Sequence, residues 1–355
     1  MKIQWSLPNV QKEDIQALRK VIQSGWFSMG PEVKKFEEKI ASYLQITYAI
    51  GVSSGTAALD VALKCLDIKN GDEILIPALT YIATGNAVLY NNAVPVFVDV
   101  DHTLNIDTSL IEEKITDRTK AIMNIDLGGN PSNYTKLRKI SKKHDIPLVV
   151  DGGQSFGSEY QGRKCCTHGL LNTTSFHSAK ILTTIEGGMV FTEDEELSVK
   201  ARSLRNQGEL SKYVHQHLGN NYRMMDLVAV LGSSQLERIK ETLRQRKKKV
   251  KYYKENLKNV QYPTELPHTF NSNFFFLILV DNRDKLNKYL NDNGIETRIT
   301  YPMPINEQLA FQRFSKEDFL VSKEISEKVI SLPIHHKLSI QQQDFIIKKI
   351  NKFTG

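Results

Sequence analysis

The sequence is poor in cysteine and has no long apolar run. Its three cysteines, Cys65 and the adjacent pair Cys165 and Cys166, form neither a disulfide framework nor a metal-binding set. No run of apolar residues approaches the roughly 18 that a membrane-spanning helix requires, and the first residues have no signal-peptide pattern. These absences predict a protein of the reducing cytoplasm that has no membrane partner and binds no metal.

Familiar phosphate-binding and nucleic-acid-binding motifs are also missing. No GxGxxG or Walker pattern occurs, which argues against a Rossmann dinucleotide site or a P-loop. The net charge is +7, and part of it lies in a basic run of Arg244, Arg246 and residues 247–249 on a helix expected over about 236–256. Glutamates accompany this run, and no helix-turn-helix or zinc pattern does. We therefore expect a solvated helix face and no nucleic-acid partner.

One lysine stands in a segment that suits covalent chemistry. Lys180 ends the run Ser175-Phe-His-Ser-Ala-Lys180 and is followed by Thr183-Thr-Ile-Glu-Gly-Gly188. An amine that forms a Schiff base needs a lowered pKa and a fixed position, and a lysine between apolar residues and small hydroxyls at a strand end has both. Taken alone, a solvated surface lysine is the commoner case.

A carboxylate suited to the same cofactor ends an apolar run. Asp151 closes Ile146-Pro-Leu-Val-Val-Asp151, which is typical of a buried parallel strand. Ligands of open α/β sheets bind at the carboxyl ends of the strands. There an aspartate can keep the pyridine nitrogen of pyridoxal phosphate (PLP) protonated, although a helix-capping or turn aspartate is an equal alternative.

The segment Gly51-Val-Ser-Ser-Gly-Thr-Ala-Ala-Leu59 has the character of a phosphate cradle. A strand runs into a turn and then a helix, so the N–H groups of Gly55 and Thr56, the hydroxyl of Ser54 and the positive helix end suit a phosphate dianion. A plain capped helix is the alternative.

Apolar strands alternate with amphipathic helices along the chain. Such alternation predicts an α/β fold with a mainly parallel seven-stranded sheet covered by helices on both faces. The expected strands are 48–53, 73–78, 94–100, 121–127, 147–151, 173–178 and 188–193. We expect a large domain over 1–240, which includes an N-terminal arm, and a smaller α+β domain over 241–355 with a strand at 274–280 and a last helix at 340–351.

Through a series of motifs in the same order along the sequence, the chain resembles the DegT/DnrJ/EryC1/StrS family of sugar aminotransferases. These are PLP enzymes of fold type I. The resemblance runs almost end to end. Its motifs are Ser24-Gly-Trp-Phe-Ser-Met-Gly-Pro31, Ser54-Gly-Thr56, residues 76–84, residues 95–101, Asp151 with Gln154, Ser175 to Lys180, Glu186-Gly-Gly188, Asn221-Tyr-Arg223, residues 294–298 with Tyr301-Pro302, and Ser331-Leu-Pro333.

The resemblance implies roles for individual residues. Lys180 is the Schiff-base lysine and proton shuttle, and Asp151 pairs with the pyridinium. Gln154 lies near the ring's phenolic oxygen, and Tyr81 stacks on the pyridine face. The phosphate is held by Gly55, Thr56, Ser175 and an Asn221 from a neighbouring subunit, which implies a homodimer with shared active sites.

The resemblance also implies the reaction. An amino donor, by family habit L-glutamate, converts PLP to pyridoxamine 5'-phosphate, which then aminates a nucleotide-linked keto-sugar. The run around Lys180 is more similar to enzymes that aminate C4 of 4-keto-6-deoxyhexoses. The expected substrate contacts are Trp26, Arg223, Arg298 and Tyr301, the two arginines toward the diphosphate.

Several residues depart from the family pattern, and alternatives stay open. Gly152 and Gly153, Asp126, Ile185 and Thr300 replace residues that are common in the family, and we expect them at the rim of the site. The departures leave open a 3-keto sugar, a cyclitol ketone or a non-catalytic PLP-binding relative. A dehydratase of the family lacks the lysine, so Lys180 argues against it.

Overall fold

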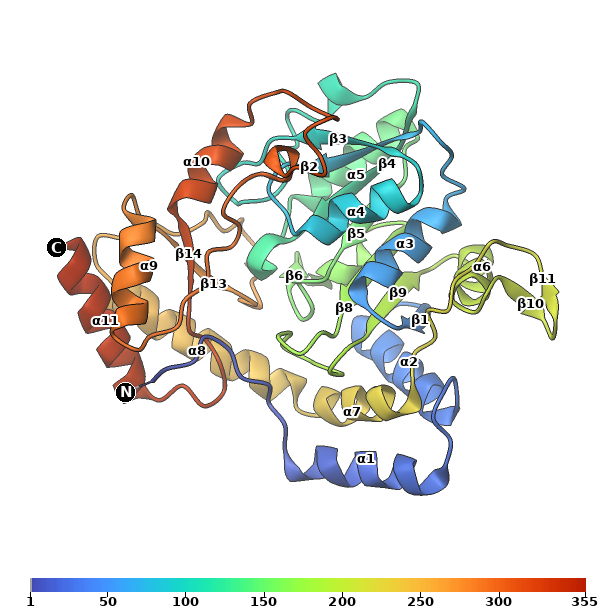
Figure 1. Ribbon diagram of the computed structural model, residues 1–355, viewed down its shortest axis with the longest axis horizontal. Helices are drawn as coiled ribbons and strands as arrows, with labels where there is room; N and C mark the ends of the chain where they lie inside the picture. The colour runs from blue at the N-terminus through green and yellow to red at the C-terminus, as the bar shows by residue number, and fades with distance from the viewer. Residues whose placement is uncertain (1) are drawn as a thin grey trace.

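The computed structural model describes residues 2–355, and a seven-stranded sheet lies at its centre (Figure 1). The strand order is β1-β9-β8-β5-β4-β2-β3, and only β9 runs antiparallel to its neighbours. The predicted mainly parallel sheet is thereby confirmed. Its strands are β1 (Tyr48–Val52), β2 (Glu73–Pro77), β3 (Val94–Val98), β4 (Thr119–Ile125), β5 (Leu148–Asp151), β8 (Leu171–Ser175) and β9 (Gly188–Thr192).

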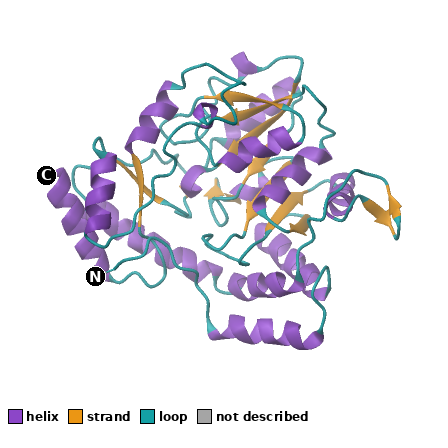
Figure 2. Ribbon diagram, viewed as in Figure 1, coloured by secondary structure: helices purple, strands orange, loops and turns teal. Residues whose placement is uncertain are grey.

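Alternate side chains of these strands enter different cores, as the pleat of a strand requires. In β2, Ile74 and Ile76 face one helical layer while Leu75 faces the other. The first layer holds α3 (Gly55–Cys65), α4 (Ile82–Tyr90) and α6 (Glu195–Arg205). The second holds α2 (Pro31–Leu44), α5 (Tyr134–His144) and α7 (Asp226–Leu236), with α1 (Lys12–Ser24) packed outside α7. Figure 2 shows helices on both sides of the strands.

The remaining elements form smaller units. Short strands are β6 (Glu159–Tyr160), β7 (Arg163–Lys164) and β12 (Thr269–Phe270), which pair together, and β10 (Glu209–Ser211) with β11 (Val214–His215), a projecting hairpin. Single turns of 3₁₀-helix occur at Glu112–Lys114, Leu127–Gly129, Cys165–Thr167 and Ile305–Glu307. Within residues 2–355, no helix combines the length and apolar character needed to cross a membrane.

The C-terminal unit has its own core. The antiparallel strands β13 (Phe276–Leu279) and β14 (Val329–Leu332) pack with α8 (Ile239–Asn256), α9 (Arg283–Asp292) and α11 (Ile340–Thr354), while α10 (Leu320–Lys328) leads into β14. Ile3 is buried in this core and pairs with Ile295. The division at residue 240 stays a prediction, but the beginning of the chain packs with its end.

One expected strand ends early. The segment 173–178 was expected to be extended, whereas β8 ends at Ser175, whose partner Gly188 is the first residue of β9. Beyond this pair the Phe176 N–H still donates to the Gly187 carbonyl at 2.9 Å, but the Phe176 carbonyl accepts from the Thr184 N–H at 2.8 Å, so the following residues close into a loop instead of continuing the strand. Lys180 therefore lies on a loop, fixed by the hydrogen bond from its N–H to the carbonyl of His177 at 2.9 Å.

The basic run on α8 is only partly a solvated face, which corrects our expectation. Arg244 is exposed and pairs with Glu241. Arg246, in contrast, turns inward and donates to the carbonyl oxygens of Asn273 (2.6 Å), Phe274 (3.0 Å) and Ile334 (3.0 Å). Burial lowers the pKa of this guanidinium to about 10. Its hydrogen bonds to Asn273 and Phe274 join α8 to the segment that precedes β13.

We expect Arg246→Met to lower the free energy of unfolding by about 2–3 kcal/mol, because three carbonyl groups lose their donor. Arg244→Met, two residues away on the same helix, removes only an exposed ion pair and should change it by less than about 1 kcal/mol. Urea unfolding of the two variants measures the difference. Equal losses would contradict the structural role of Arg246.

Candidate active site

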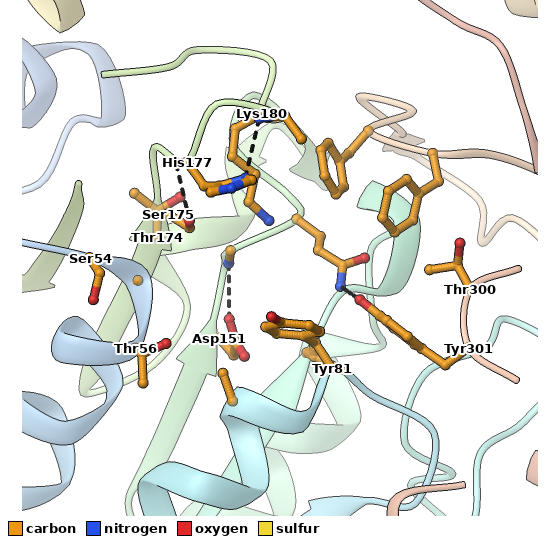
Figure 3. Close-up of a pocket in the computed structure, with 18 of the residues that line it drawn as sticks. Ser54, Thr56, Tyr81, Asp151, Thr174, Ser175, His177, Lys180, Thr300 and Tyr301 are labelled. Atoms are coloured by element: carbon orange, nitrogen blue, oxygen red, sulfur yellow. Dashed lines mark hydrogen bonds between the residues drawn. The ribbon is translucent and has the colours of Figure 1, made fainter. Parts of the chain in front are cut away.

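A cavity of about 550 Å³ lies where the sheet's parallel strands end at their carboxyl side. It brings together Lys180, Asp151, Gly55, Thr56, Tyr81, Gln154, Ser175, Arg298 and Tyr301, nine of the twelve residues singled out from the sequence. Figure 3 shows Lys180 reaching from its loop toward Asp151, with Tyr81 beside Asp151 and Tyr301 beyond it. Residues from five separate parts of the chain thus converge on one site.

The side chain of Lys180 is half-buried at the cavity, and the loss of water around its amine sets its charge. Desolvation lowers the pKa of Lys180 to about 8, against the opposing attraction of Asp151. Its Nζ lies 4.3 Å from the ring centre of Phe274. Roughly a tenth of the amine is therefore neutral at pH 7, far more than for a lysine in water, and the neutral form is the one in which an amine attacks a carbonyl.

Asp151 stands at the end of β5 and is held by two donors. The Thr84 hydroxyl donates to its Oδ2 at 2.8 Å, and the Gly153 N–H donates to its Oδ1 at 3.0 Å. Burial raises the pKa of this carboxyl, while these hydrogen bonds and Lys180 oppose the rise. A ring nitrogen that shares its proton with Asp151 would supply the cationic partner that a buried carboxylate needs.

The turn before α3 forms the cradle at the other end of the cavity. Ser54 caps α3, its Oγ accepting from the Ala57 N–H at 3.0 Å. A Cβ at Gly55 would lie 2.7 Å from the Cβ of Ser175, and one at Gly188 would lie 2.2 Å from the carbonyl oxygen of Ser54. Only glycine permits this close approach, and it leaves the helix N-terminus beside the hydroxyls of Thr56 and Ser175. The site thus fits PLP, with its phosphate in the cradle and its pyridine nitrogen at Asp151.

Gln154 and Tyr301 form the wall opposite the cradle. The side-chain amide of Gln154 donates to the Tyr301 hydroxyl at 3.0 Å and accepts from the Gly128 N–H at 2.8 Å. The rings of Tyr301 and Tyr81 lie 5.9 Å apart. Tyr81, the residue before α4, is half exposed because one face of its ring borders the open cavity.

Three expected site residues lie outside this cavity. Trp26 is largely exposed near α1 and α2, in a separate surface groove. Asn221 and Arg223 follow the β10–β11 hairpin, where Arg223 donates to Asn206 at 3.0 Å. The expected roles of these three residues stay predictions.

The departures from the family pattern are not all at the rim, contrary to expectation. Asp126 is fully buried and accepts from the Tyr134 hydroxyl at 2.6 Å. A Cβ at Gly152 would lie 2.5 Å from the Sγ of the buried Cys166, so this glycine accommodates that cysteine. Ile185 is exposed, and Thr300 borders the cavity.

Sequence reasoning missed several residues at or behind the cavity. Thr84 is buried behind Asp151, to which its hydroxyl donates. Its position four residues after Thr80, within the motif at residues 76–84, was the available signal. Trp5, Phe274 and Phe275 line the cavity itself. No sequence pattern relates these aromatic residues to Lys180, because the beginning of the chain and the segment before β13 bring them there. No group of three potential metal ligands occurs within residues 2–355.

In the cofactor-free protein, we expect the trace acetylation of Lys180 by acetic anhydride to rise with a midpoint near pH 8, because the anhydride reacts with the neutral amine only. In Asp151→Asn the midpoint should fall further, since the charge that favours the ammonium form is gone. Peptide mass mapping measures the modification. Lys35, whose pKa its partner Glu32 raises, is the internal control, and a midpoint for Lys180 as high as that of Lys35 would contradict the buried amine.

Known proteins resemble the chain over nearly its whole length. The model of the DegT/DnrJ/EryC1/StrS aminotransferase family matches residues 8–351. A dTDP-3-amino-3,6-dideoxy-alpha-D-galactopyranose transaminase of Aneurinibacillus thermoaerophilus is 36% identical over 97% of this chain and 96% of its own. A GDP-perosamine synthase of Escherichia coli O157:H7 is 34% identical over 98% and 97%.

The fold agrees with these relatives. An aminotransferase of Streptococcus pneumoniae, solved in its PLP form, matches with a TM-score of 0.93 at 26% identity and covers 100% of this chain and 99% of that one. The predicted PLP fold of type I is confirmed, and the cofactor is PLP. With Lys180, Asp151 and the glycine cradle in one cavity, the chain belongs to the DegT/DnrJ/EryC1/StrS aminotransferase family.

Proposed function

We propose that this protein transfers an amino group from L-glutamate to a nucleotide-linked keto-sugar, at C4 of a 4-keto-6-deoxyhexose. The observation that carries the proposal is the cavity in which the buried amine of Lys180 faces Asp151, with a glycine cradle at the other end. Two relatives, a dTDP-sugar transaminase and a GDP-perosamine synthase, support a nucleotide sugar as substrate.

The residues divide the work of PLP-dependent transamination. PLP, when bound, supplies an electron sink that stabilises negative charge at the substrate carbon. We assign to Lys180 the removal of the proton from the amino acid's α-carbon and its delivery to the cofactor, and the reverse transfer with the sugar. A neutral amine can accept this proton, and the lowered pKa of Lys180 keeps that form available.

The other residues hold the cofactor in the orientation that proton transfer needs. Asp151, fixed by Thr84, keeps the pyridine nitrogen protonated. Gly55, Thr56 and Ser175 bind the phosphate, and Tyr81 covers the ring face. Gln154 is assigned to the phenolic oxygen of the cofactor, to which its side-chain amide would donate a hydrogen bond. The same amide donates to the Tyr301 hydroxyl.

The proposal includes a homodimer with shared active sites. The β10–β11 hairpin projects from the body of the protein (Figure 1). It and the turn after it expose apolar residues, with Tyr213 81% and Leu218 91% accessible. A second subunit that covers them would bring Asn221 and Arg223 toward its partner's site, as the family resemblance implies. An enzyme that turns over as a monomer would contradict this arrangement.

The position of amination has one competing assignment. The segment around Lys180 favours C4, whereas the Aneurinibacillus relative carries a 3-amino group in its name. Trp26, Arg223, Arg298 and Tyr301 remain the proposed substrate contacts. Of these, Arg298 and Tyr301 line the cavity of the same chain.

We expect the PLP-loaded enzyme, given L-glutamate and a dTDP-4-keto-6-deoxyhexose, to release 2-oxoglutarate and form a product that NMR identifies as the 4-amino sugar. Parallel assays use the 3-keto isomer and an inosose, which represent the competing ketones. Lys180→Ala should bind PLP but lose turnover by several orders of magnitude, because among residues 2–355 no other lysine lines the cavity. Retained turnover in Lys180→Ala would contradict the assigned role, and inactivity with all three ketones would favour the non-catalytic alternative.

A further inference from the structure

A buried carboxylate lies on α3, outside the reaction cavity. The side chain of Asp60 is 1% exposed. Its Oδ1 accepts from the Asn91 amide at 2.9 Å and pairs with the ammonium group of Lys64. Its Oδ2 accepts from the Tyr222 hydroxyl at 3.0 Å and from the Asn220 amide at 3.4 Å. A buried charge needs such partners, but two of these four come from a segment far along the chain.

This segment follows the β10–β11 hairpin and runs beside β1, a strand at one edge of the sheet. The Ser53 N–H donates to the Tyr222 carbonyl at 2.8 Å, and the Tyr222 N–H donates to the Arg205 carbonyl at 2.9 Å. Burial, and then the charge of Asp60, raise the pKa of Tyr222 to about 12. The Tyr222 hydroxyl therefore stays protonated at neutral pH and continues to donate to Asp60.

Asn221 stands between the two residues of this segment that Asp60 binds. It is exposed and does not line the cavity of its own chain. Among residues 2–355, no group forms a hydrogen bond with its side chain, whereas its neighbours Asn220 and Tyr222 both donate to Asp60. The backbone at Asn221 is thus fixed while its side-chain amide is free. Such an arrangement suits a contact with a group outside the chain.

We propose that Asp60 is a positioning residue that holds Asn221 in place for the cofactor phosphate bound by the partner subunit. This inference rests on the proposed function, in which Asn221 acts across the dimer, and deepens it. The helix α3 then serves both sites. Its first turn, with Gly55 and Thr56, forms the cradle of its own subunit, and Asp60, one turn later, orients the side chain given to the other. An amide that is already ordered binds more tightly, because less conformational entropy is lost.

Titration of the visible band of the bound cofactor measures the Kd of PLP in each variant. Asn221→Ala, which removes the contact itself, should raise this Kd by about 10- to 100-fold, the range for a hydrogen bond to a charged group. Asp60→Ala and Tyr222→Phe loosen the contact without removing it, so each should raise the Kd by only about 3- to 10-fold. Tyr222→Phe leaves the bonds of Asp60 to α3 and α4 intact and tests the role even if Asp60→Ala folds poorly. The double variant should be no worse than the more affected single one.

Pyridoxal, which lacks the phosphate, separates positioning from a general loosening of the site. Asp60→Ala and Tyr222→Phe should bind pyridoxal as the wild type does, because Asn221 has no phosphate to meet. Equal losses of affinity for PLP and pyridoxal would overturn the positioning role, and so would an unchanged Kd of PLP in both variants. Asp67→Ala is the matched control. Asp67 follows α3, is exposed and pairs with Lys200 at 2.6 Å, so its loss should change neither Kd.

Mixed dimers test whether the effect crosses between subunits. Lys180→Ala and Tyr222→Phe chains that carry different tags are produced together, and the mixed dimer is purified through both tags. Only its Tyr222→Phe subunit retains Lys180, and the Asn221 that reaches this site comes from the chain in which Tyr222 is intact. The visible band should therefore titrate with the wild-type Kd.

A Kd equal to that of the Tyr222→Phe homodimer would overturn the action across the interface. If Asn221→Ala leaves the affinity for PLP unchanged, the phosphate contact and the positioning role are both disproved. Turnover of the wild-type enzyme with L-glutamate and a keto-sugar is measured separately. Its presence beside a negative binding result shows that the aminotransfer stands while this inference fails.

Discussion

The active site depends on the removal of one amine from water beside one carboxylate. In water, the amine of Lys180 would be almost fully charged at neutral pH and unable to accept a proton. Burial lowers its pKa to about 8, while Asp151 limits the shift. The same burial raises the pKa of Asp151, which Thr84 and Gly153 oppose by hydrogen bonds. The two side chains thus tune each other, and the cofactor fits between groups prepared for it.

The architecture supplies that burial from several directions. The end of β5 presents Asp151, and the end of β8 with its loop presents Lys180. The first turn of α3 closes the cradle, where Gly55 and Ser175 approach too closely for any side chain on the glycine. The C-terminal unit then covers the amine with Phe274, whose carbonyl is held by Arg246. A site built from one domain alone would leave Lys180 open to water.

Local patterns in the sequence were enough to predict the sheet, and to single out residues that the structure gathers in one cavity. Lys180, Asp151 and the turn at Gly55 stand at strand or helix ends, where sequence and geometry are closely coupled. Prediction failed where long-range packing decides. The inward turn of Arg246 depends on carbonyl groups far along the chain. Asp126 is buried where the sheet and α5 meet, although its hydroxyl partner Tyr134 is close in the sequence. The rings of Phe274, Phe275 and Trp5 pack together at the cavity because the beginning of the chain contacts the C-terminal unit. No local motif in the sequence indicates this contact.

The measurement that tests the central claim most directly is the visible absorption spectrum of the PLP-saturated protein before and after addition of L-glutamate. If the buried amine of Lys180 engages the cofactor, the bound protein has a visible band that free PLP lacks, and glutamate abolishes it as the cofactor takes up the amino group. A spectrum equal to that of free PLP, or one that glutamate leaves unchanged, would contradict the account.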